Sequence, residues 1–367
     1  MFFRRIGKFI TLVREFSQLD LFPIRRTLRR YDGQKAMADM RAGVNVALLA
    51  FPQGMAYALI AGLPIQYGIY GSAIATLIGA VFAGSHFITL GPTNATSVML
   101  LSTFAVLGVS GEEKLALLPL IVSLVGMFLV IGAYLRVDTL IQYISRTVVT
   151  GYVTAAAFLI MANQVKTALG FRFGEGEQAT NFYEVAYLTL KYFPNAEGST
   201  ILLSAITAAV YLLLKKYLPA LPNVALTLVV IAFVSVGFNR IEGWELQMLA
   251  GVDASSWKLT LPPFDLSTAV SLSDSALAIA LLCILEGTSI GKSLAARAGA
   301  RLNTNQEMLS TGMANLGCAL FSGMPASGSL TRSALSIGSG ARTVVASLFC
   351  GIIVAVGAVT VGPLVAY

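Results

Sequence analysis

The stretch Gly-Pro-Thr-Asn-Ala-Thr-Ser-Val-Met-Leu-Leu-Ser, residues 91–102, has the pattern of a helix that begins inside a membrane. Pro92 suits a first helical position, and Thr93 and Asn94 crowd the same turn. The apolar run ends near Val106, so the helix has roughly 15 residues and is about 22 Å long. A bilayer core is about 30 Å thick, which this helix cannot cross. We therefore predict that its first turn lies at mid-membrane, where free N–H groups must face a cavity or a ligand.

A second stretch repeats this design. Residues 325–338 read Pro-Ala-Ser-Gly-Ser-Leu-Thr-Arg-Ser-Ala-Leu-Ser-Ile-Gly, again a breaker, then hydroxyl residues, then a short helix that carries Arg332 in its first turns. The N-terminal end of a helix is the positive end of its dipole and attracts anions. Two broken helices in corresponding halves of a hydrophobic chain point to a transporter binding site.

The composition is that of a polytopic helical membrane protein. The 367 residues are 56% hydrophobic and 12% charged, with a mean hydropathy of +0.77, whereas roughly a quarter of a soluble domain is charged. Cys283, Cys318 and Cys350 all fall in apolar runs without metal-ligand spacing. We find no nucleophile–base pair, metal cluster or phosphate-binding loop in the sequence, so we expect neither an enzyme nor a bound metal or cofactor.

Hydropathy places about 11 membrane spans along the chain. They lie near 43–60, 68–83, 92–106, 115–135, 148–165, 201–214, 224–236, 271–290, 308–321, 325–340 and 344–361. Residues 1–41 hold ten Lys/Arg against four Asp/Glu, which predicts that this basic segment is cytoplasmic and lies near anionic lipid rather than nucleic acid. The loop charges then make spans 1 and 8 enter from opposite sides, as two inverted repeats of seven spans require.

Span 1 contains Phe-Pro-Gln-Gly-Met-Ala-Tyr, residues 51–57. Gln53 places an amide in hydrocarbon, and Tyr57 lies on the same helical face because it is four residues further on. These two side chains either line a cavity or belong to a Pro-kinked span whose amide bonds a neighbouring helix. The glycine-rich run at 67–71 has no strand context, so we interpret it as tight helix packing rather than a nucleotide loop.

Two charged residues in the predicted spans, Arg332 and Glu286, are candidates for a functional role. An embedded Arg costs several kcal/mol by most estimates, so Arg332, with Ser329 and Thr331, suits the counter-charge for an anion. Glu286 lies deep in span 8, where a lone carboxyl favours its protonated form and can carry a proton. The alternatives are snorkelling of Arg332, an Arg332–Glu286 ion pair, or a cation ligand at Glu286.

These motifs together resemble the SulP family of anion transporters, the sulfate permease and prestin-like proteins. The resemblance covers roughly residues 35–367. It is carried by the stretch at 49–70, by Leu-Gly-Pro-Thr at 90–93, by Ser-Arg-Thr-Val-Val-Thr-Gly-Tyr-Val at 145–153, by Asn-Gln-Glu-Met at 305–308, by Ser-Gly-Ser-Leu-Thr-Arg-Ser-Ala at 327–334 and by Gly-Ala-Arg-Thr at 340–343.

The resemblance implies a 14-span fold of two inverted repeats, the all-α UraA-like transporter fold. A core domain would comprise residues 42–136 and 268–367, and a gate domain residues 137–240, with an extracytoplasmic loop at 241–267 and the cytoplasmic segment at 1–41. The last gate spans and a cytoplasmic STAS domain, usual in the family, are absent from the sequence, which departs from the family here. Homodimers are also usual.

Carried over by position, the resemblance places substrate between the third and tenth helices. Gln53 and Tyr57 would line its pocket, Ser329, Leu330 and Arg332 would form the tenth-helix side, and Glu286 would occupy the position that bacterial members use for cation coupling. Thr93, Asn94 and Thr331 complete our set of candidate substrate-binding residues.

We expect proton-coupled uptake of a small anion across an inner or plasma membrane, with sulfate first, bicarbonate second and a dicarboxylate third. Sodium coupling is the lesser alternative, because Ile290, one turn beyond Glu286, offers no oxygen ligand. A non-transporting membrane scaffold or truncated relic is the alternative from another class. The nucleobase permeases, thought to share the fold, fit less well: their histidine-bearing span 1 motif is absent, and an embedded Arg suits an anion.

Overall fold

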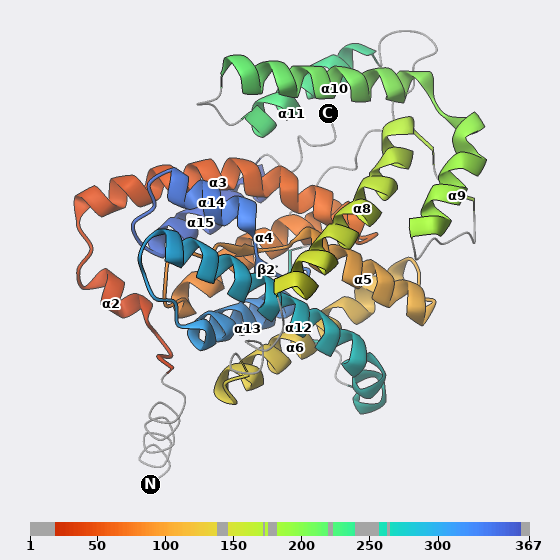
Figure 1. Ribbon diagram of the computed structural model, residues 1–367. Helices are drawn as coiled ribbons and strands as arrows, with labels where there is room; N and C mark the ends of the chain where they lie inside the picture. Colours follow the sequence, from red (N-terminus) through yellow and green to blue (C-terminus); the bar gives the residue numbers. More distant parts are fainter. Residues whose placement is uncertain are drawn as a thin grey trace.

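The computed structural model describes residues 19–137, 146–171, 173–174, 182–218, 223–238, 257–262 and 265–360. This part of the chain is almost entirely helical (Figure 1). In chain order the elements are α2 (Ile24–Leu28), α3 (Gly33–Ile60), α4 (Ile65–Phe82), β1 (Leu90–Gly91), α5 (Asn94–Leu107), α6 (Glu112–Tyr134), α8 (Arg146–Leu169), α9 (Phe182–Tyr192), the 3-10 turn η1 (Phe193–Asn195), α10 (Gly198–Tyr217), α11 (Asn223–Phe238), α12 (Leu266–Arg297), α13 (Thr304–Leu320), β2 (Ser327–Gly328), α14 (Leu330–Gly338) and α15 (Val345–Thr360).

Five of the described helices are long and apolar enough to cross a membrane: α3, α4, α6, α10 and α12. Three shorter apolar helices accompany them, including α5 and α15. The polytopic membrane character expected from the hydropathy is therefore present in the folded chain.

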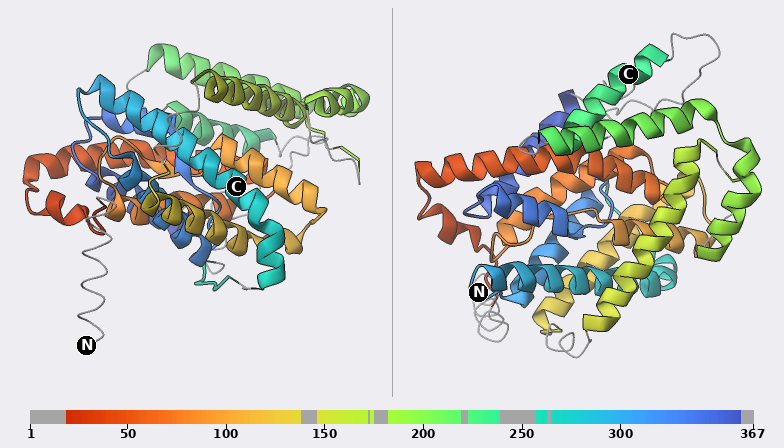
Figure 2. Two further views of the ribbon diagram at one scale, coloured as in Figure 1. Left: turned by 60° about the horizontal axis from the view of Figure 1, so that its bottom comes forward. Right: turned by 45° about the horizontal axis from the view of Figure 1, so that its top comes forward.

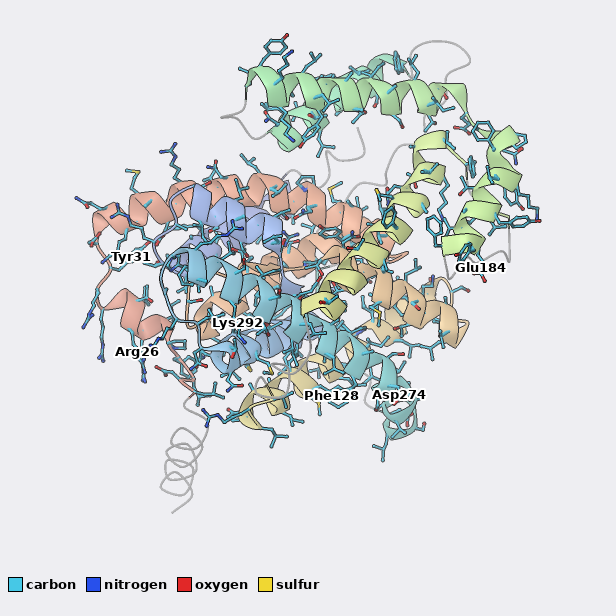
Figure 3. The ribbon with its side chains drawn as sticks, in the orientation of Figure 1. Arg26, Tyr31, Phe128, Glu184, Asp274 and Lys292 are labelled. Atoms are coloured by element: carbon cyan, nitrogen blue, oxygen red, sulfur yellow. The ribbon has the colours of Figure 1, made fainter. Side chains whose placement is uncertain are left out.

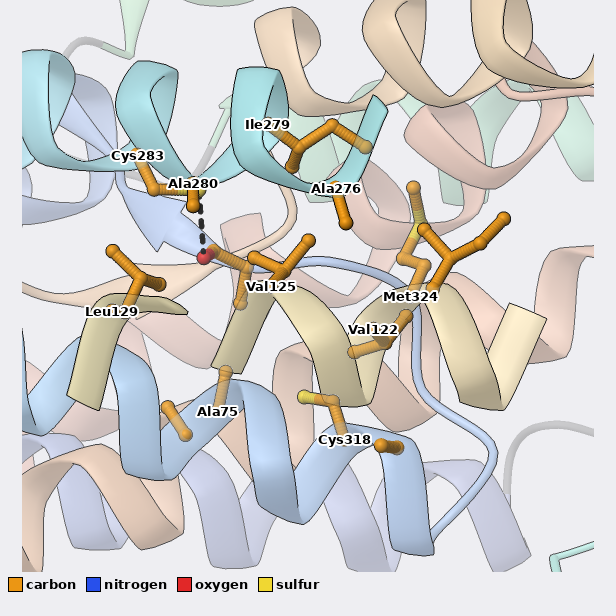
Figure 4. Packing of buried hydrophobic residues seen from close by; sticks show 14 of the residues in the cluster. Ala75, Val122, Val125, Leu129, Ala276, Ile279, Ala280, Cys283, Cys318 and Met324 are labelled. Atoms are coloured by element: carbon orange, nitrogen blue, oxygen red, sulfur yellow. Dashed lines mark hydrogen bonds between the residues drawn. The ribbon is translucent and has the colours of Figure 1, made fainter. Parts of the chain in front are cut away.

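The core is built from the first and last helices of the chain. Helix α13 packs against α6 and α4, and α15 packs against α3 and α4. Between them lies a continuous apolar cluster in which Val125 of α6, Ile279 of α12 and Cys318 of α13 are almost wholly buried (Figure 4). Helices from both halves of the sequence thus interleave around one interior.

Helices α8 to α11 form a separate outer layer (Figures 1 and 2). Its contacts with the core are sparse and come mainly from α8 against α5 and from α11 against α3. Helix α10 has no buried residue, and Leu212 and Phe233 are 62% and 76% exposed. Such apolar exposure is what a membrane-facing or helix-facing surface requires.

Helices α3 and α4 cross at unusually short range because glycines meet at the crossing. A Cβ added to Gly68 of α4 would lie 1.9 Å from the carbonyl oxygen of Gly54 in α3. No side chain fits there, so the two backbones touch, as small residues allow between membrane helices. The interpretation of the glycine-rich run as tight helix packing is confirmed.

Several predicted boundaries differ from the structure. Helix α3 begins at Gly33, ten residues before the predicted start, because Asp32 caps it by accepting from the Lys35 N–H at 2.9 Å. The helix expected from Pro92 begins instead at Asn94, with Thr93 as its N-cap. Helix α9 and the β1–β2 pair were not predicted; α9 lies in a mixed polar and aromatic segment without a 20-residue apolar run. Most of the predicted loop at 241–267 lies outside the described residues.

Candidate functional site

The two short helices begin face to face at the centre of the core. Residues immediately before them form a two-stranded antiparallel pair, in which Leu90 lies opposite Gly328 and Gly91 opposite Ser327. After β1 the chain enters α5, and after β2 it enters α14, so the pairing brings the N-terminal ends of both helices together. Each end presents free backbone N–H groups and the positive end of a helix dipole.

Helix α5 begins with a capping box that also holds a carboxylate. The Thr93 hydroxyl accepts from the Thr96 N–H at 3.3 Å, and the Thr96 hydroxyl accepts from the Thr93 N–H at 3.1 Å. Thr93 also donates to Oε2 of Glu286 on α12 at 3.1 Å. Thr93, at the start of the first half-helix, and Glu286, the predicted proton carrier, are therefore in direct contact.

Helix α14 begins with Ser329, whose hydroxyl accepts from the Arg332 N–H at 3.4 Å. The Arg332 side chain is fully buried. Its Nε donates to Oε1 of Gln53 at 2.9 Å, and its Nη2 donates to the Ser72 hydroxyl at 3.3 Å. A guanidinium pointing inward with these partners is not snorkelling.

The third nitrogen of this guanidinium, Nη1, is buried without a hydrogen-bond partner among the described residues. It lies against the backbone of Gly91: a Cβ built there would be 1.7 Å from Nη1. Glycine is therefore required at residue 91 by close approach of the charge. The Arg332 guanidinium therefore extends from α14 to the backbone just before α5.

Glu286 and Arg332 form no ion pair with each other in the described part of the chain. The alternative of a fixed Arg332–Glu286 pair is wrong, because the carboxylate bonds α5 while the guanidinium bonds α3 and α4. The site therefore has an acidic side and a basic side that do not neutralise each other by contact.

The remaining predicted residues surround the two helix ends. Gln53 bonds two consecutive residues in the first turn of α14. Its Nε2 donates to the Thr331 hydroxyl at 3.3 Å, and its Oε1 accepts from Arg332. Leu330 is 56% exposed, Thr331 is exposed, and Tyr57 and Asn94 are partly exposed. Leu330 and Thr331 are thus the most exposed of the candidate residues, whereas Ser329 and Thr93 are buried as caps and Oδ1 of Asn94 is also buried.

Two residues of the site were missed by the sequence analysis. Ser72 bonds the guanidinium, and Asn315 of α13 holds the turn before β2 by donating to the Ala326 carbonyl at 2.8 Å and accepting from its N–H at 3.0 Å. A lone Ser in a glycine-rich helix gives no signal. Asn315, a fully buried amide, carried the same signal as Gln53 and could have been found by it.

A row of polar contacts fastens α14 along α3. Gln53 meets Thr331 at one end, the Asn45 amide donates to the Ser339 hydroxyl at 3.0 Å further along, and buried Asp39 accepts from the Arg342 N–H at 2.7 Å. The residue numbers fall on α3 as they rise on α14, so the two helices run antiparallel. These contacts fix the position of α14 along α3, and therefore the position of Arg332.

The arrangement has features that favour an anion. One full positive charge and two helix N-termini lie together at the starts of α5 and α14, while the nearby carboxylate is held by Thr93. Among the described residues no group of three or more His, Cys, Asp or Glu could hold a metal ion.

This fold and site define a polytopic membrane transporter with two opposed half-helices. Residues 37–367 match the family model of the sulfate permease family. The chain belongs to this family, which is one of membrane transporters and not of enzymes.

Relatives and solved structures agree with this assignment. The chain is 30% identical over 355 residues to sulfate transporter 4.1 of Arabidopsis thaliana, covering 95% of this chain and 51% of the relative. It superposes on the transmembrane domain of the cyanobacterial bicarbonate transporter BicA with a TM-score of 0.82 at 19% identity, covering 92% of this chain and 85% of that one. For murine Slc26a9, an anion transporter in the inward-facing state, the TM-score is 0.84 at 20% identity, with coverage of 95% and 60%.

These structural likenesses show the fold, which is the expected inverted-repeat transporter fold. The chain spans about half the length of the curated relatives it matches.

Proposed function

We propose that the chain forms the substrate-carrying part of a secondary active transporter for a small anion, with sulfate as the first candidate and bicarbonate or a dicarboxylate next. The observation that carries this proposal is the convergence of buried Arg332 with the N-termini of α5 and α14. A guanidinium that is buried away from water and the N-terminal ends of two helix dipoles favour a compact anion over a neutral or cationic solute. The sulfate transporters among the relatives support sulfate as the first candidate.

Coupling is assigned to Glu286. Its carboxylate sits at the start of α5, one hydrogen bond from Thr93, where protonation changes the charge beside the anion position by one unit. A proton on Glu286 favours an anion nearby because it removes a like charge. This placement supports proton symport. Sodium coupling is the alternative, with Glu286 and Thr93 as oxygen ligands.

Movement is assigned to the core against the outer layer. The site is built from α3, α4, α5, α12, α13 and α14 and from the β1–β2 pair, all of them parts of the core, and the outer layer touches this core sparsely. An elevator-type displacement would carry the intact site past α8 to α11. We place the protein in an inner or plasma membrane, with a cytoplasmic N-terminus and a homodimeric assembly.

The test is radiolabelled sulfate uptake into proteoliposomes containing the full-length protein. We expect uptake that is stimulated by an inward proton gradient, unchanged by replacing sodium with potassium, and competed by unlabelled sulfate more strongly than by bicarbonate or fumarate. Stronger competition by bicarbonate would reassign the substrate, and a sodium requirement would reassign the coupling. No binding or uptake of any of these three anions would contradict the anion site.

A further inference from the structure

The segment that leads into α3 carries a cluster of exposed arginines. We define the basic patch as Arg25, Arg26, Arg29 and Arg30, on and just after α2, with Arg41 two turns into α3. Asp20 pairs with Arg25 at 3.3 Å and with Arg26 at 2.7 Å. Arg29 and Arg30 form no ion pair within the described residues. The basic patch therefore keeps a large excess of positive charge.

Exposed apolar side chains adjoin the basic patch. Phe22 and Leu28 are each 54% exposed, and along α3 an exposed stripe consists of Met37, Met40, Val44 and Leu48. The spacing of this stripe puts it on one helical face. Exposed apolar groups of this kind suit the boundary between headgroups and acyl chains.

The length of α3 sets the depth of the patch. Its 28 residues extend about 42 Å, whereas a bilayer core is about 30 Å thick. Helix α3 therefore continues beyond the hydrocarbon. The arginines cluster at its Gly33 end (Figure 3 shows Arg26 and Tyr31 together at this end), so a membrane around the apolar part of α3 would bring them near the headgroups.

A cavity lies beside Arg26. It has a volume of about 320 Å³ and lies between the α2 segment and the ends of α4 and α13. Arg26 and its ion-pair partner Asp20 line it on one side, and Asn303 and Gln306 on the other. Its wall is held in place by Gln306, whose amide bonds both the N–H and the carbonyl of Asp20 at 2.8 Å.

We propose that the basic patch, with Arg26 lining this cavity, binds the phosphate headgroup of an anionic membrane lipid. Arginine forks match phosphate oxygens, and the neighbouring Phe22, Leu28 and Met37 give the acyl side of a lipid an apolar surface. Free phosphate would use the charges but leave these apolar groups in water. An acidic protein segment would not require arginines level with the headgroups. The chemistry and the depth together favour lipid.

The test measures binding of fluorescent phosphatidylglycerol and phosphatidylcholine to the detergent-solubilised full-length protein. The main variant is Arg29→Gln/Arg30→Gln, which breaks no ion pair. Its matched control is Lys215→Gln/Lys216→Gln, another adjacent exposed basic pair, at the end of α10. A third variant, Arg26→Gln, tests the cavity. Thermal unfolding of each variant checks that the fold is kept.

We expect wild type to bind phosphatidylglycerol more tightly than phosphatidylcholine, with binding that weakens as salt rises. The double arginine variant loses two charge-assisted contacts with the phosphate, so its affinity for phosphatidylglycerol should fall by roughly an order of magnitude or more. The lysine control should stay within about twofold of wild type.

Equal affinity for the two lipids would overturn the proposal, and so would equal losses in the arginine variant and its lysine control. Displacement of the lipid by inorganic phosphate at millimolar concentration would overturn it in favour of a free anion site. If phosphatidylglycerol does not bind while an acidic peptide does, the basic patch belongs to a protein partner and the lipid proposal fails. None of these results bears on sulfate uptake, which is measured separately.

Discussion

The two half-helices use the same backbone device with opposite chemistry. Both α5 and α14 follow a two-residue strand, both are capped by a hydroxyl residue, and both begin at the same position in the core. The cap of α5 donates to a carboxylate, Glu286, whereas α14 carries the buried guanidinium of Arg332. In the proposed function, the backbone provides one place for an anion, with attraction from Arg332 and coupling through Glu286 on its two sides.

This difference has an energetic basis. A helix N-terminus supplies about half an elementary charge, which neighbouring water and carboxylates readily offset. A buried guanidinium supplies a whole charge that hydration does not screen. The α14 side should therefore determine whether an anion binds at all, and the α5 side should determine how binding depends on protons.

The largest effect should come from removing the charge of α14. Arg332→Ala deletes the guanidinium together with its bonds to Gln53 and Ser72, and bonds to charged groups contribute about 1.5–3 kcal/mol each. We expect sulfate uptake to fall by more than about 100-fold. Arg342→Ala, an exposed arginine ten residues further on whose backbone bonds Asp39, should transport normally. Unchanged sulfate, bicarbonate and fumarate uptake by Arg332→Ala would exclude this residue from the site.

The second largest effect on sulfate binding should come from the substitution Gly91→Ala. The Gly91→Ala methyl group would lie 1.7 Å from Nη1 of Arg332, so the guanidinium must move from its bonds with Gln53 and Ser72. Overpacking of this kind costs about 1–3 kcal/mol, and we expect sulfate affinity to fall roughly tenfold or more. Equilibrium binding and thermal unfolding, measured together, separate loss of affinity from loss of fold.

The matched control for this change is Gly338→Ala, at the other end of α14, where an added Cβ meets nothing within 4 Å. It should bind sulfate as wild type does. If Gly91→Ala keeps wild-type affinity, the guanidinium has room to relax and its contact with residue 91 does not position it.

The requirement at Gly91 shows where sequence reasoning stops. Hydropathy and helix-breaking residues predicted the spans, the two half-helices and Arg332 as the buried charge, because each of these is local in the chain. The partners of Arg332 come from α3 and α4, and the glycine it touches precedes α5. Contacts between segments roughly 240 to 280 residues apart leave no periodic pattern in one sequence.

The same limit explains two further features at the centre of the site that the sequence did not predict. The β1–β2 pair is only two residues long on each side, too short for an alternating pattern. The placement of Glu286 beside Thr93 rather than Arg332 depends on the rotation of α12, which hydropathy alone does not determine. The resemblance to a family supplied the set of residues, and the structure supplied their pairing.

The α5 side is tested by changing how transport depends on protons. Glu286→Gln keeps a side chain of the same shape beside Thr93 but removes the titrating group. If Glu286 carries the proton, wild-type uptake should rise as pH falls, while the variant should vary by less than about twofold between about pH 5.5 and 8. Sulfate affinity at low pH should be close to that of wild type, since the neutral amide mimics the protonated acid.

Glu112→Gln, an exposed carboxylate at the start of α6, is the control and should keep the wild-type pH profile. An unchanged pH profile in Glu286→Gln would remove the coupling role from the α5 side. A simultaneous loss of all sulfate binding would show that both half-helices contribute to affinity and that the division between them is wrong.

The smallest effect should come from the C-terminal end of α14. Changes there test whether the position of α14 along α3 affects the placement of Arg332. Asn45→Ala removes the hydrogen bond to the Ser339 hydroxyl, worth about 0.5–1.5 kcal/mol. Ser339→Ala removes the same bond from the other side. We expect each variant to raise the KM for sulfate by about two- to threefold with kcat unchanged, because the bond positions Arg332 without touching the anion.

Because the two variants delete one shared bond, the double variant should show no further rise in KM. The pH profile should stay that of wild type, since the α5 side is untouched. Additive effects would mean that Asn45 and Ser339 act through different neighbours. Equal falls in kcat with KM unchanged would mean that the row of contacts along α3 governs movement of the core rather than placement of the guanidinium.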